Sequence, residues 1–234
     1  MLIFAMDTTG STASVALMED GIVRYECVCR NKRTHSQTIM PLTEEAFVHS
    51  GLSVKDVDYF AVAVGPGSYT GVRIAVAATK AMAHACQKPC ISIDALEVLA
   101  KGVFQFDGIV CPIMDARAGQ VYAAIFDGVS GERLYEDVAM KIDEFIEVAR
   151  EKAQGKRLLF VGDGVPVHQE TIQTAFKEKV LFASPAFSHP NPAIIASLAT
   201  KNVPDAIPYG ELAPLYLRAP QAVRERLARE QQNG

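Results

Sequence analysis

The chain has no tryptophan, only five cysteines, and little excess charge of either sign. Lys and Arg total 23 while Asp and Glu total 27, so the net charge is −4 at pH 7. A module that grips a nucleic-acid backbone by itself carries a clear excess of basic residues. The composition therefore excludes such a module, and RNA binding would need a local basic patch or a partner protein.

Long apolar runs are also missing. No segment approaches the roughly 20 consecutive apolar residues that cross a bilayer. The apolar start is interrupted by Asp7 and lacks the basic flank and the cleavage pattern of a signal peptide. The odd number of cysteines, without a second ligand pair, predicts reduced thiols rather than disulfides or a metal site. We therefore expect a cytoplasmic protein that does not bind membranes.

The common catalytic motifs are absent as well. No HExxH occurs, and no histidine has a second histidine three or four residues away. This pattern disfavours a zinc or iron site on a helix. No GxSxG elbow supports a serine hydrolase. The stretch 65–71, GPGSYTG, lacks the Gly-Lys-Ser/Thr ending of a phosphate loop. It predicts a strand-to-helix turn in which Ser68 or Thr70 caps the helix, with an anion bound at the helix start as the less favoured alternative.

What the chain does contain is an internal duplication. Residues 2–18 and 110–126 each have the pattern of a β-hairpin, in which an apolar strand ending in Met-Asp precedes a short turn and a second strand. A third strand is expected after each hairpin, and a helix, a buried strand and a second helix then follow. These elements are predicted at 22–29, 36–50, 59–64 and 70–87 in the first half and at 133–139, 143–152, 158–161 and 166–177 in the second, with further short elements at 90–100 and 181–200.

The repeated β-β-β-α-β-α order predicts an α/β protein of two lobes, each a mixed sheet covered by helices, with a cleft between them. This arrangement resembles the actin, Hsp70 and sugar-kinase nucleotide-binding fold. We place the first, partner-binding lobe at 1–104, the second lobe at 105–220, and a charged, flexible tail at 221–234.

In that fold, one hairpin turn per lobe holds the nucleotide phosphates through backbone N–H groups, and an Asp at the end of the first strand holds the metal or its water. The first turn of this chain meets the requirement for small residues beside an anion. The second turn does not, because Arg117 and Ala118 stand where glycines are needed. We therefore expect no bound cofactor or metal, with an ATP-binding, kinase-like enzyme as the alternative. The weak candidates for cofactor binding are Asp7, Thr8, Thr9 and Gly10.

The helix predicted at 70–87 is apolar on too many sides for a helix that covers one face of a sheet. A surface helix needs an apolar face of about 100° or somewhat more, and any excess must be buried by something. The neighbouring helix at 36–50 could cover part of it, although Pro41 should kink that helix or define its first turn. We favour a subunit interface over complete burial within the chain. The strongly polar residues past the first turn form one narrow stripe: Arg73, Lys80, His84 and Gln87.

Six stretches spread from Leu2 to about Arg218 together resemble the TsaB (YeaZ) family, a bacterial tRNA N6-threonylcarbamoyladenosine biosynthesis subunit. The spacing of GPGSYTGVR and DARAGQVY is specific to this family. One departure lies at 117–120, where the family usually has Arg-Gly-Glu and this chain has Arg-Ala-Gly-Gln. The six stretches are MDTTGSTASVAL, HSQTIMP, GPGSYTGVRIA, MDARAGQVYAAIF, VGDG and Leu215-Tyr216-Leu217-Arg218.

The resemblance implies a non-catalytic subunit that pairs with the catalytic subunit TsaD and works with the ATPase TsaE. TsaD transfers a threonylcarbamoyl group, supplied as the adenylate by TsaC, to the adenosine 3′ of the anticodon in tRNAs that read codons starting with A. The chain would contact tRNA only through this complex and would form a homodimer when isolated. A glycoprotease-type peptidase, an older description of the family, is the least favoured alternative because no nucleophile–base pair is visible.

The resemblance also implies where the partner binds, because the TsaB–TsaD contact is a helix bundle formed by the first lobes. The matching positions here lie on the two helices at 36–50 and 70–87. The residues expected at the partner interface are His35, Ile39, Met40, Tyr69, Thr70, Arg73, Val76, Ala77, Lys80, Ala81 and His84.

Overall fold

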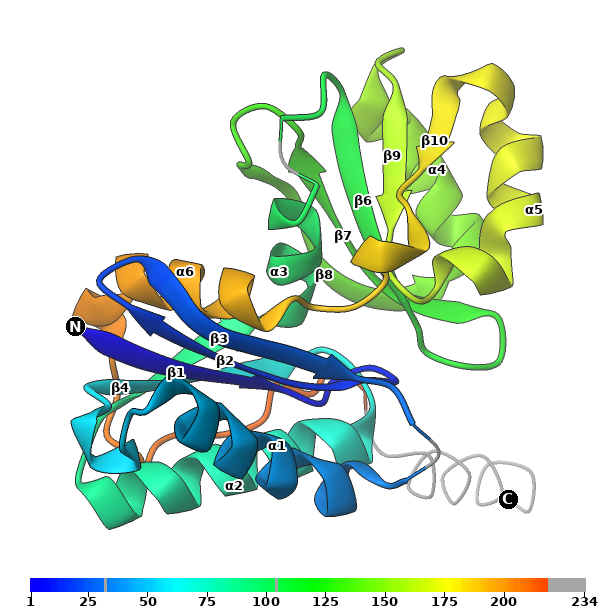
Figure 1. Ribbon diagram of the computed structural model, residues 1–234. Helices are drawn as coiled ribbons and strands as arrows, with labels where there is room; N and C mark the ends of the chain where they lie inside the picture. Colours follow the sequence, from blue (N-terminus) through cyan, green and yellow to red (C-terminus); the bar gives the residue numbers. More distant parts are fainter. Residues whose placement is uncertain (32, 104, 219–234) are drawn as a thin grey trace, which may run out of the picture.

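The structure, a computed structural model, describes residues 1–31, 33–103 and 105–218. Two five-stranded sheets, one in each lobe, form its framework, and helices flank both sheets (Figure 1). The first sheet contains β1 (Leu2–Asp7), β2 (Ala13–Glu19), β3 (Ile22–Cys29), β4 (Tyr59–Gly65) and β5 (Cys90–Asp94). The second contains β6 (Ile109–Asp115), β7 (Gln120–Asp127), β8 (Arg133–Lys141), β9 (Leu158–Val161) and β10 (Val180–Phe182). The helices are α1 (His35–Ser50), α2 (Tyr69–Cys86), α3 (Ala95–Lys101), α4 (Ile142–Ala153), α5 (Val165–Phe176) and α6 (Pro192–Lys201).

The two sheets have the same topology. The first has the order β3-β2-β1-β4-β5, and the second has the equivalent order β8-β7-β6-β9-β10. In each sheet the central strand pairs antiparallel with the strand that follows it and parallel with the buried strand after the first helix. The duplicated β-β-β-α-β-α order and the two-lobed α/β fold class predicted from the sequence are therefore confirmed.

Alternation of side chains along the strands divides the apolar interior into three cores. On β1, Ile3 and Ala5 point to one face of the sheet, while Phe4 and Met6 point to the other, as the two-residue period of a strand requires. The outer face of the first sheet packs on α1 and α2, and the outer face of the second packs on α4 and α5. The inner faces of both sheets share a central core with α3 and α6.

The last helix of each repeat contacts the sheet of the other lobe. Helix α3 packs on β6 and β7 as well as on β4 and β5, and α6 packs on β1 and β2 of the first sheet. The predicted extent of the second lobe, 105–220, therefore differs from the structure, because the chain from α6 onward lies on the first lobe. The physical reason is burial: Ile195, Ala196 and Ala199 of α6 cover the inner face of the first sheet, which would otherwise expose apolar side chains.

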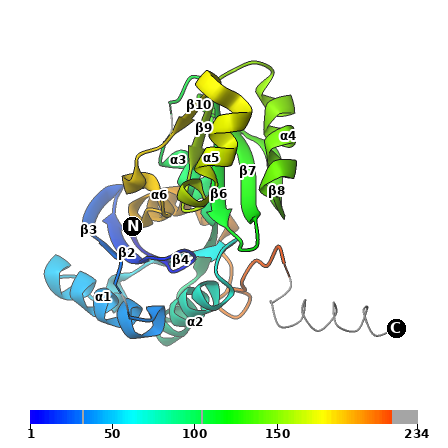
Figure 2. The same cartoon turned by 90° about the vertical axis from the view of Figure 1, so that its right-hand side faces the viewer.

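The chain after α6 continues along the first lobe. Ile207 forms an antiparallel bridge with Cys90 of β5. The segment 209–218, which we call the strap, then runs between α2 and the second lobe, where Figure 2 shows it in orange to red. The predicted tail at 221–234 lies outside the described residues.

Candidate functional site

The first hairpin turn is organised around a buried carboxyl group. Asp7, the last residue of β1, is fully buried, and its Oδ1 accepts a hydrogen bond from the Thr9 backbone N–H at 2.9 Å. Burial is the main cause that raises the pKa of Asp7 to about 7, while hydrogen bonding by Thr9 lowers it. Asp7 Oδ2, Thr12 Oγ1 and Ser14 Oγ have no hydrogen-bond partner among the described residues. The turn therefore covers a small polar region that is closed to solvent.

The glycine-rich loop before α2 packs directly on this turn. The backbone N–H of Ser68 donates to the Thr9 carbonyl at 2.7 Å, and the Thr8 hydroxyl donates to the Gly71 carbonyl at 2.6 Å. A Cβ on Gly67 would lie 2.5 Å from the Thr9 carbonyl oxygen, so only glycine fits there. Ser68 Oγ accepts the Gly71 N–H at 3.3 Å, which confirms the predicted helix cap. The GPGSYTG motif thus joins the first turn to the start of α2.

The second hairpin turn has a different character. Arg117, Ala118 and Gly119 all have positive φ angles, of 66°, 52° and 70°. The left-handed region costs a residue with a side chain roughly 1–2 kcal/mol, so two of these residues are strained. The Arg117 side chain is 88% exposed, with Nε 3.8 Å from Asp115 Oδ2. The backbone of this turn therefore has a conformation that favours glycine, and the departure from a glycine-rich phosphate turn lies in the side chains of Arg117 and Ala118.

Asp163, in the loop between β9 and α5, brings the two turns together. Its Oδ1 accepts the Asp115 backbone N–H at 3.2 Å, and its Oδ2 lies 3.4 Å from the position that a Cβ on Gly10 would occupy. Burial raises the pKa of Asp163, and the nearby Asp115 carboxylate adds to the rise. Asp163 is not among the site residues that the sequence predicted. A signal was present, because VGDG at 161–164 repeats VGPG at 64–67 at the equivalent strand end.

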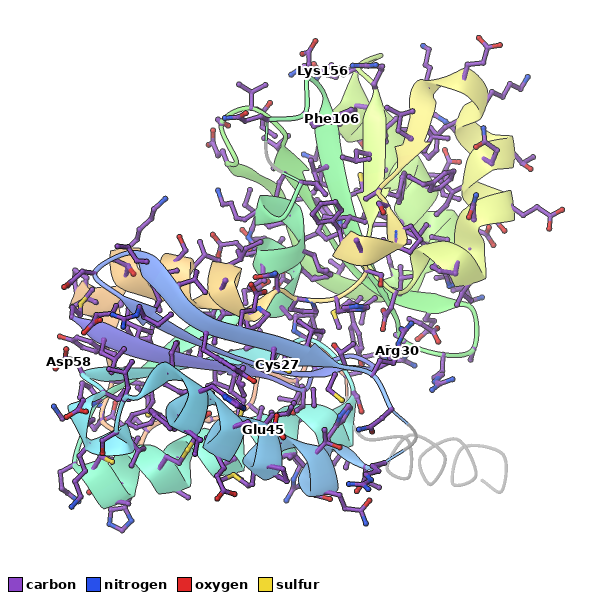
Figure 3. The ribbon with its side chains drawn as sticks, in the orientation of Figure 1. Cys27, Arg30, Glu45, Asp58, Phe106 and Lys156 are labelled. Carbon is purple, nitrogen blue, oxygen red and sulfur yellow. The ribbon has the colours of Figure 1, made fainter. Side chains whose placement is uncertain are left out.

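A cleft of about 360 Å³ lies between the lobes, bounded by both turns, the glycine-rich loop and the strap. Of the four candidate cofactor-binding residues, Thr9 and Gly10 line it, whereas Asp7 and Thr8 are buried beneath the turn. Its walls include the carboxylates of Asp115 and Asp163 and also basic side chains. Arg30, labelled in Figure 3, lies after β3 and outside the lining of this cleft, and it donates to Oγ of Ser11, which does line the cleft, at 2.6 Å. Within the described ranges, no group of three or more His, Cys, Asp or Glu side chains is placed to hold a metal ion.

A second candidate site lies on the outer side of the first lobe, where α1 and α2 pack side by side (Figure 2). Its exposed side chains include Met40 and Val48 of α1, which are 46% and 70% exposed. Glu45, labelled in Figure 3, is also exposed on α1. We call this surface the α1–α2 face. The residues that define it are Met40, Pro41, Glu44, Val48, Arg73, Ala77, Ala81 and Ala85.

The structure places the residues expected at the partner interface in several different environments. Met40, Arg73, Ala77 and Ala81 are exposed on the α1–α2 face, and His84 is exposed beside it. Tyr69 and Thr70 are exposed at the start of α2, where they line the cleft. His35 is half-buried, and its Nε2–H donates to the Gly10 carbonyl at 3.0 Å.

Two of these residues are not accessible. Ile39 and Val76 are buried in the core between the first sheet and its two helices. Their apolar side chains face inward because each helix must cover the sheet before it can offer a face to a partner. The expectation that Ile39 and Val76 contact a partner is therefore wrong for this structure.

The strap contacts the polar stripe of α2 at Lys80 and His84. Lys80 Nζ donates to the carbonyls of Gly210 and Leu212 at 2.8 and 3.4 Å. The His84 ring packs against Tyr209 with ring centres 4.9 Å apart. The sequence predicted only the helix at 36–50 as an intrachain neighbour of α2, and no local pattern indicates a contact between segments so far apart in the chain. None of the helices in the described part of the chain has both the length and the apolar character of a membrane span.

Comparisons with known proteins agree with this architecture. The profile of the family described as TsaD: tRNA N6-adenosine threonylcarbamoyltransferase matches residues 29–224. Among solved structures, YeaZ from Pseudomonas aeruginosa has a TM-score of 0.79 and 24% identity, over 92% of this chain and 99% of that one. Component A of the (R)-2-hydroxyglutaryl-CoA dehydratase of Acidaminococcus fermentans has a TM-score of 0.52 and 10% identity, over 87% of this chain and 99% of that one. The two-lobed fold therefore extends beyond close relatives.

The sequence similarity is more specific than the fold. The tRNA threonylcarbamoyladenosine biosynthesis protein TsaB of Bacillus subtilis is 32% identical over 224 residues, which are 95% of this chain and 96% of that protein. An alignment at this level over nearly the full length of both chains confirms the family that the sequence motifs indicate. The chain belongs to the TsaB (YeaZ) family and is a protein of tRNA threonylcarbamoyladenosine biosynthesis.

Proposed function

We propose that this chain is the non-catalytic, activating subunit of a cytoplasmic complex that adds a threonylcarbamoyl group to the adenosine 3′ of the anticodon in tRNA. In this proposal TsaD is the catalytic subunit and binds the α1–α2 face, and TsaE works with the pair. The tRNA is contacted through the complex, and the isolated chain forms a homodimer through the same face. The observation that carries the proposal is the row of small, exposed side chains on α2.

This row is suited to a helix–helix contact. Ala77, Ala81 and Ala85 follow one another at four-residue spacing, so they lie along one side of α2. Because alanine has no side chain beyond Cβ, a second helix can approach the backbone closely. Met40 and Val48 add larger apolar side chains on the neighbouring helix. Together they offer a partner an apolar centre of the kind that protein interfaces bury.

The described part of the chain leaves this row uncovered. The strap packs along one flank of α2, at Lys80 and His84. Helix α1 packs along the other flank. Ala77 and Ala81 remain exposed between the two. Charged side chains at Glu44 and Arg73 border the apolar centre and supply the polar rim that is common in interfaces.

A second candidate function is an ATP-binding, kinase-like enzyme, and the cleft of about 360 Å³ favours it because Thr9 and Gly10 line its wall. Against it, the second turn has an exposed arginine and an alanine in the left-handed region in place of glycines. Calorimetry with ATP and magnesium on the isolated protein separates the two proposals. Micromolar binding would favour the enzyme, and an absence of binding at millimolar nucleotide would favour the subunit.

The decisive experiment combines co-purification with reconstitution. Tagged TsaD is used to capture this chain as wild type, as Ala81→Glu, and as Ala186→Glu, a matched control at an exposed alanine of the second lobe. A charge in the centre of the interface should weaken association by about 30-fold or more, while the control should bind as the wild type does. Circular dichroism checks that both variants are folded. Equal capture of all three proteins would show that the α1–α2 face is not the binding site.

Reconstituted tRNA modification then tests the role of the chain. The reaction should require the wild-type chain and should be lost with Ala81→Glu at concentrations where the wild type is active. Full modification by TsaD, TsaE and TsaC without this chain would contradict the proposal that it is an activating subunit.

A further inference from the structure

The strap contacts three parts of the molecule that the proposed function leaves separate: helix α2, the end of β4 at the cleft, and the second hairpin turn. We propose that the strap couples the α1–α2 face to the interlobe cleft, with Arg218 as the positioning residue that holds the second hairpin turn. The part of this inference that concerns a partner bound to the α1–α2 face rests on the proposed function. The coupling between α2 and the cleft within the isolated chain is independent of the proposed function.

The strap is attached to α2 through its backbone. Lys80 Nζ donates to two strap carbonyls, those of Gly210 and Leu212, and hydrogen bonds from a charged donor are stronger than neutral ones. Leu212 is buried in the outer core of the first lobe, which adds an apolar anchor at the same point. The beginning of the strap therefore follows any movement of α2.

The middle of the strap is positioned by β4. The Leu215 backbone N–H donates to the Val64 carbonyl at 2.8 Å. The contact is close because Gly65 has a φ of +123°, and a Cβ at this residue would lie 2.6 Å from the Leu215 carbonyl oxygen. A backbone-to-backbone contact of this kind leaves little room for sliding, so displacement at one end is passed along the strap.

Beyond β4, the strap connects the α1–α2 face with the mouth of the cleft. The Tyr216 ring stacks on Tyr69, with ring centres 4.9 Å apart. Arg73, on the α1–α2 face, donates from Nη1 to the Tyr69 hydroxyl at 2.9 Å. Tyr69 and Tyr216 also line the cleft. A partner that moves Arg73 therefore acts on a pair of rings that forms part of the cleft wall.

The end of the strap reaches the other lobe. Arg218 Nη1 donates to the Ala116 carbonyl at 2.9 Å, which ties the strap to the second hairpin turn. That turn contains two residues with side chains in the left-handed region, Arg117 and Ala118. A strained segment persists only when its surroundings hold it in place. We assign this holding role to Arg218.

Hydrogen exchange measured by mass spectrometry on the isolated full chain tests the inference. The readout is the peptide over 114–121, because the Ala116 and Gln120 amides donate within the second turn, to the Gln120 and Arg117 carbonyls. Loss of a hydrogen bond from a charged donor in Arg218→Ala should speed exchange in this peptide by about tenfold. The control is Arg24→Ala, which removes an exposed arginine on β3, at the outer edge of the first sheet.

A variant far from the turn separates coupling from a purely local contact. Lys80→Ala removes the two hydrogen bonds from Lys80 to the strap without touching residue 116, and it should speed exchange at 114–121 by about threefold in addition to loosening 209–214. Both variants are compared with the wild type in the same oligomeric state, which light scattering establishes. Faster exchange at 209–214 with no change at 114–121 would overturn the coupling, and an unchanged turn in Arg218→Ala would overturn the role of Arg218.

The response to a partner is measured on the TsaD-bound chain. TsaD should slow exchange at 114–121 in the wild type and should do so much less in Arg218→Ala. If TsaD binds and leaves the turn unchanged, the coupling to the partner is wrong while the proposed function stands. If TsaD does not bind the wild-type chain, the proposed function fails, and the result from Lys80→Ala still decides whether the strap couples α2 to the cleft.

Discussion

The Thr8 hydroxyl donates a hydrogen bond of 2.6 Å to the carbonyl of Gly71, which joins the first hairpin turn to the first turn of α2. The donor belongs to the turn that lines the cleft, and the acceptor belongs to the helix that presents the α1–α2 face. The position of α2 and the shape of the turn are therefore linked by this contact and by the Ser68 N–H to Thr9 carbonyl hydrogen bond beside it. The two motifs that contain these residues, DTTG and GPGSYTG, act as a single structural unit.

Replacing Gly71 by alanine should disrupt this unit. An added Cβ would lie 2.0 Å from the Thr8 carbonyl oxygen, which is impossible without movement of the backbone. Alanine favours helices, but only by about 1 kcal/mol relative to glycine, and overpacking costs about 1–3 kcal/mol or more. We expect Gly71→Ala to lower the free energy of unfolding by about 2 kcal/mol, measured by urea denaturation.

The control for this substitution is Gly210→Ala. An added Cβ at Gly210 would meet nothing within 4 Å, so this variant should unfold close to the wild type. Equal stability of Gly71→Ala and Gly210→Ala would show that the turn and the helix adapt to each other more easily than the contact distances imply.

The free energy of unfolding should depend on pH through the titration of Asp7. Its pKa rises from 3.8 to about 7 on folding, so the unfolded chain loses this proton at a lower pH than the folded chain does. The contribution of Asp7 to the free energy of unfolding is therefore greatest below about pH 4. It falls as the pH rises to about 7. Asp7→Asn keeps an acceptor for the Thr9 N–H and has no charge to bury. We expect the variant to exceed the wild type by about 2 kcal/mol at pH 8.

The difference between Asp7→Asn and the wild type should shrink toward zero near pH 3, where the wild-type carboxyl group is protonated in both states. Urea denaturation across pH 3–8 measures it. Asp107→Asn, at an exposed position, serves as the control and should show no such pH-dependent gain. A variant less stable than the wild type at pH 8 would mean that the buried carboxylate has a compensating partner in solution.

Asp7 should matter little for activity. In the proposed complex the first lobe supplies a binding face rather than a catalytic ion, so Asp7→Ala should reduce the rate of tRNA modification far less than Ala81→Glu does. The measurement is the initial rate in a reconstituted reaction with TsaD, TsaE and TsaC, at concentrations where each variant is folded. Equal losses would indicate that the first lobe binds an ion needed for the reaction.

The isolated chain should self-associate through the α1–α2 face, because the apolar row on α2 is exposed in the absence of a partner. Light scattering should report a dimer for the wild type and a monomer for Ala77→Glu. A wild-type chain that stays monomeric at high concentration would contradict the assignment of this face as an interface.

Much of the fold was predictable from local patterns. Alternating and continuous apolar runs indicated β1, β2, β6 and β7, and one narrow polar stripe on an otherwise apolar segment indicated α2. The repeated Met-Asp at the ends of β1 and β6 revealed the duplication. These features depend on neighbours within a few residues, because the periods of strands and helices are local properties of the backbone. The sequence was also sufficient to indicate the family.

Tertiary structure decided which surfaces remain free. Only packing shows that Ile39 and Val76 are buried, that α6 covers the first sheet, and that the strap covers Lys80. The same holds for Asp163, whose carboxylate meets both turns across the cleft. Residues distant along the chain meet because apolar faces must be covered and buried donors must find acceptors. The local sequence determines which apolar faces must be covered and which donors need acceptors. The folded chain as a whole determines which distant segment covers each face or accepts each hydrogen bond.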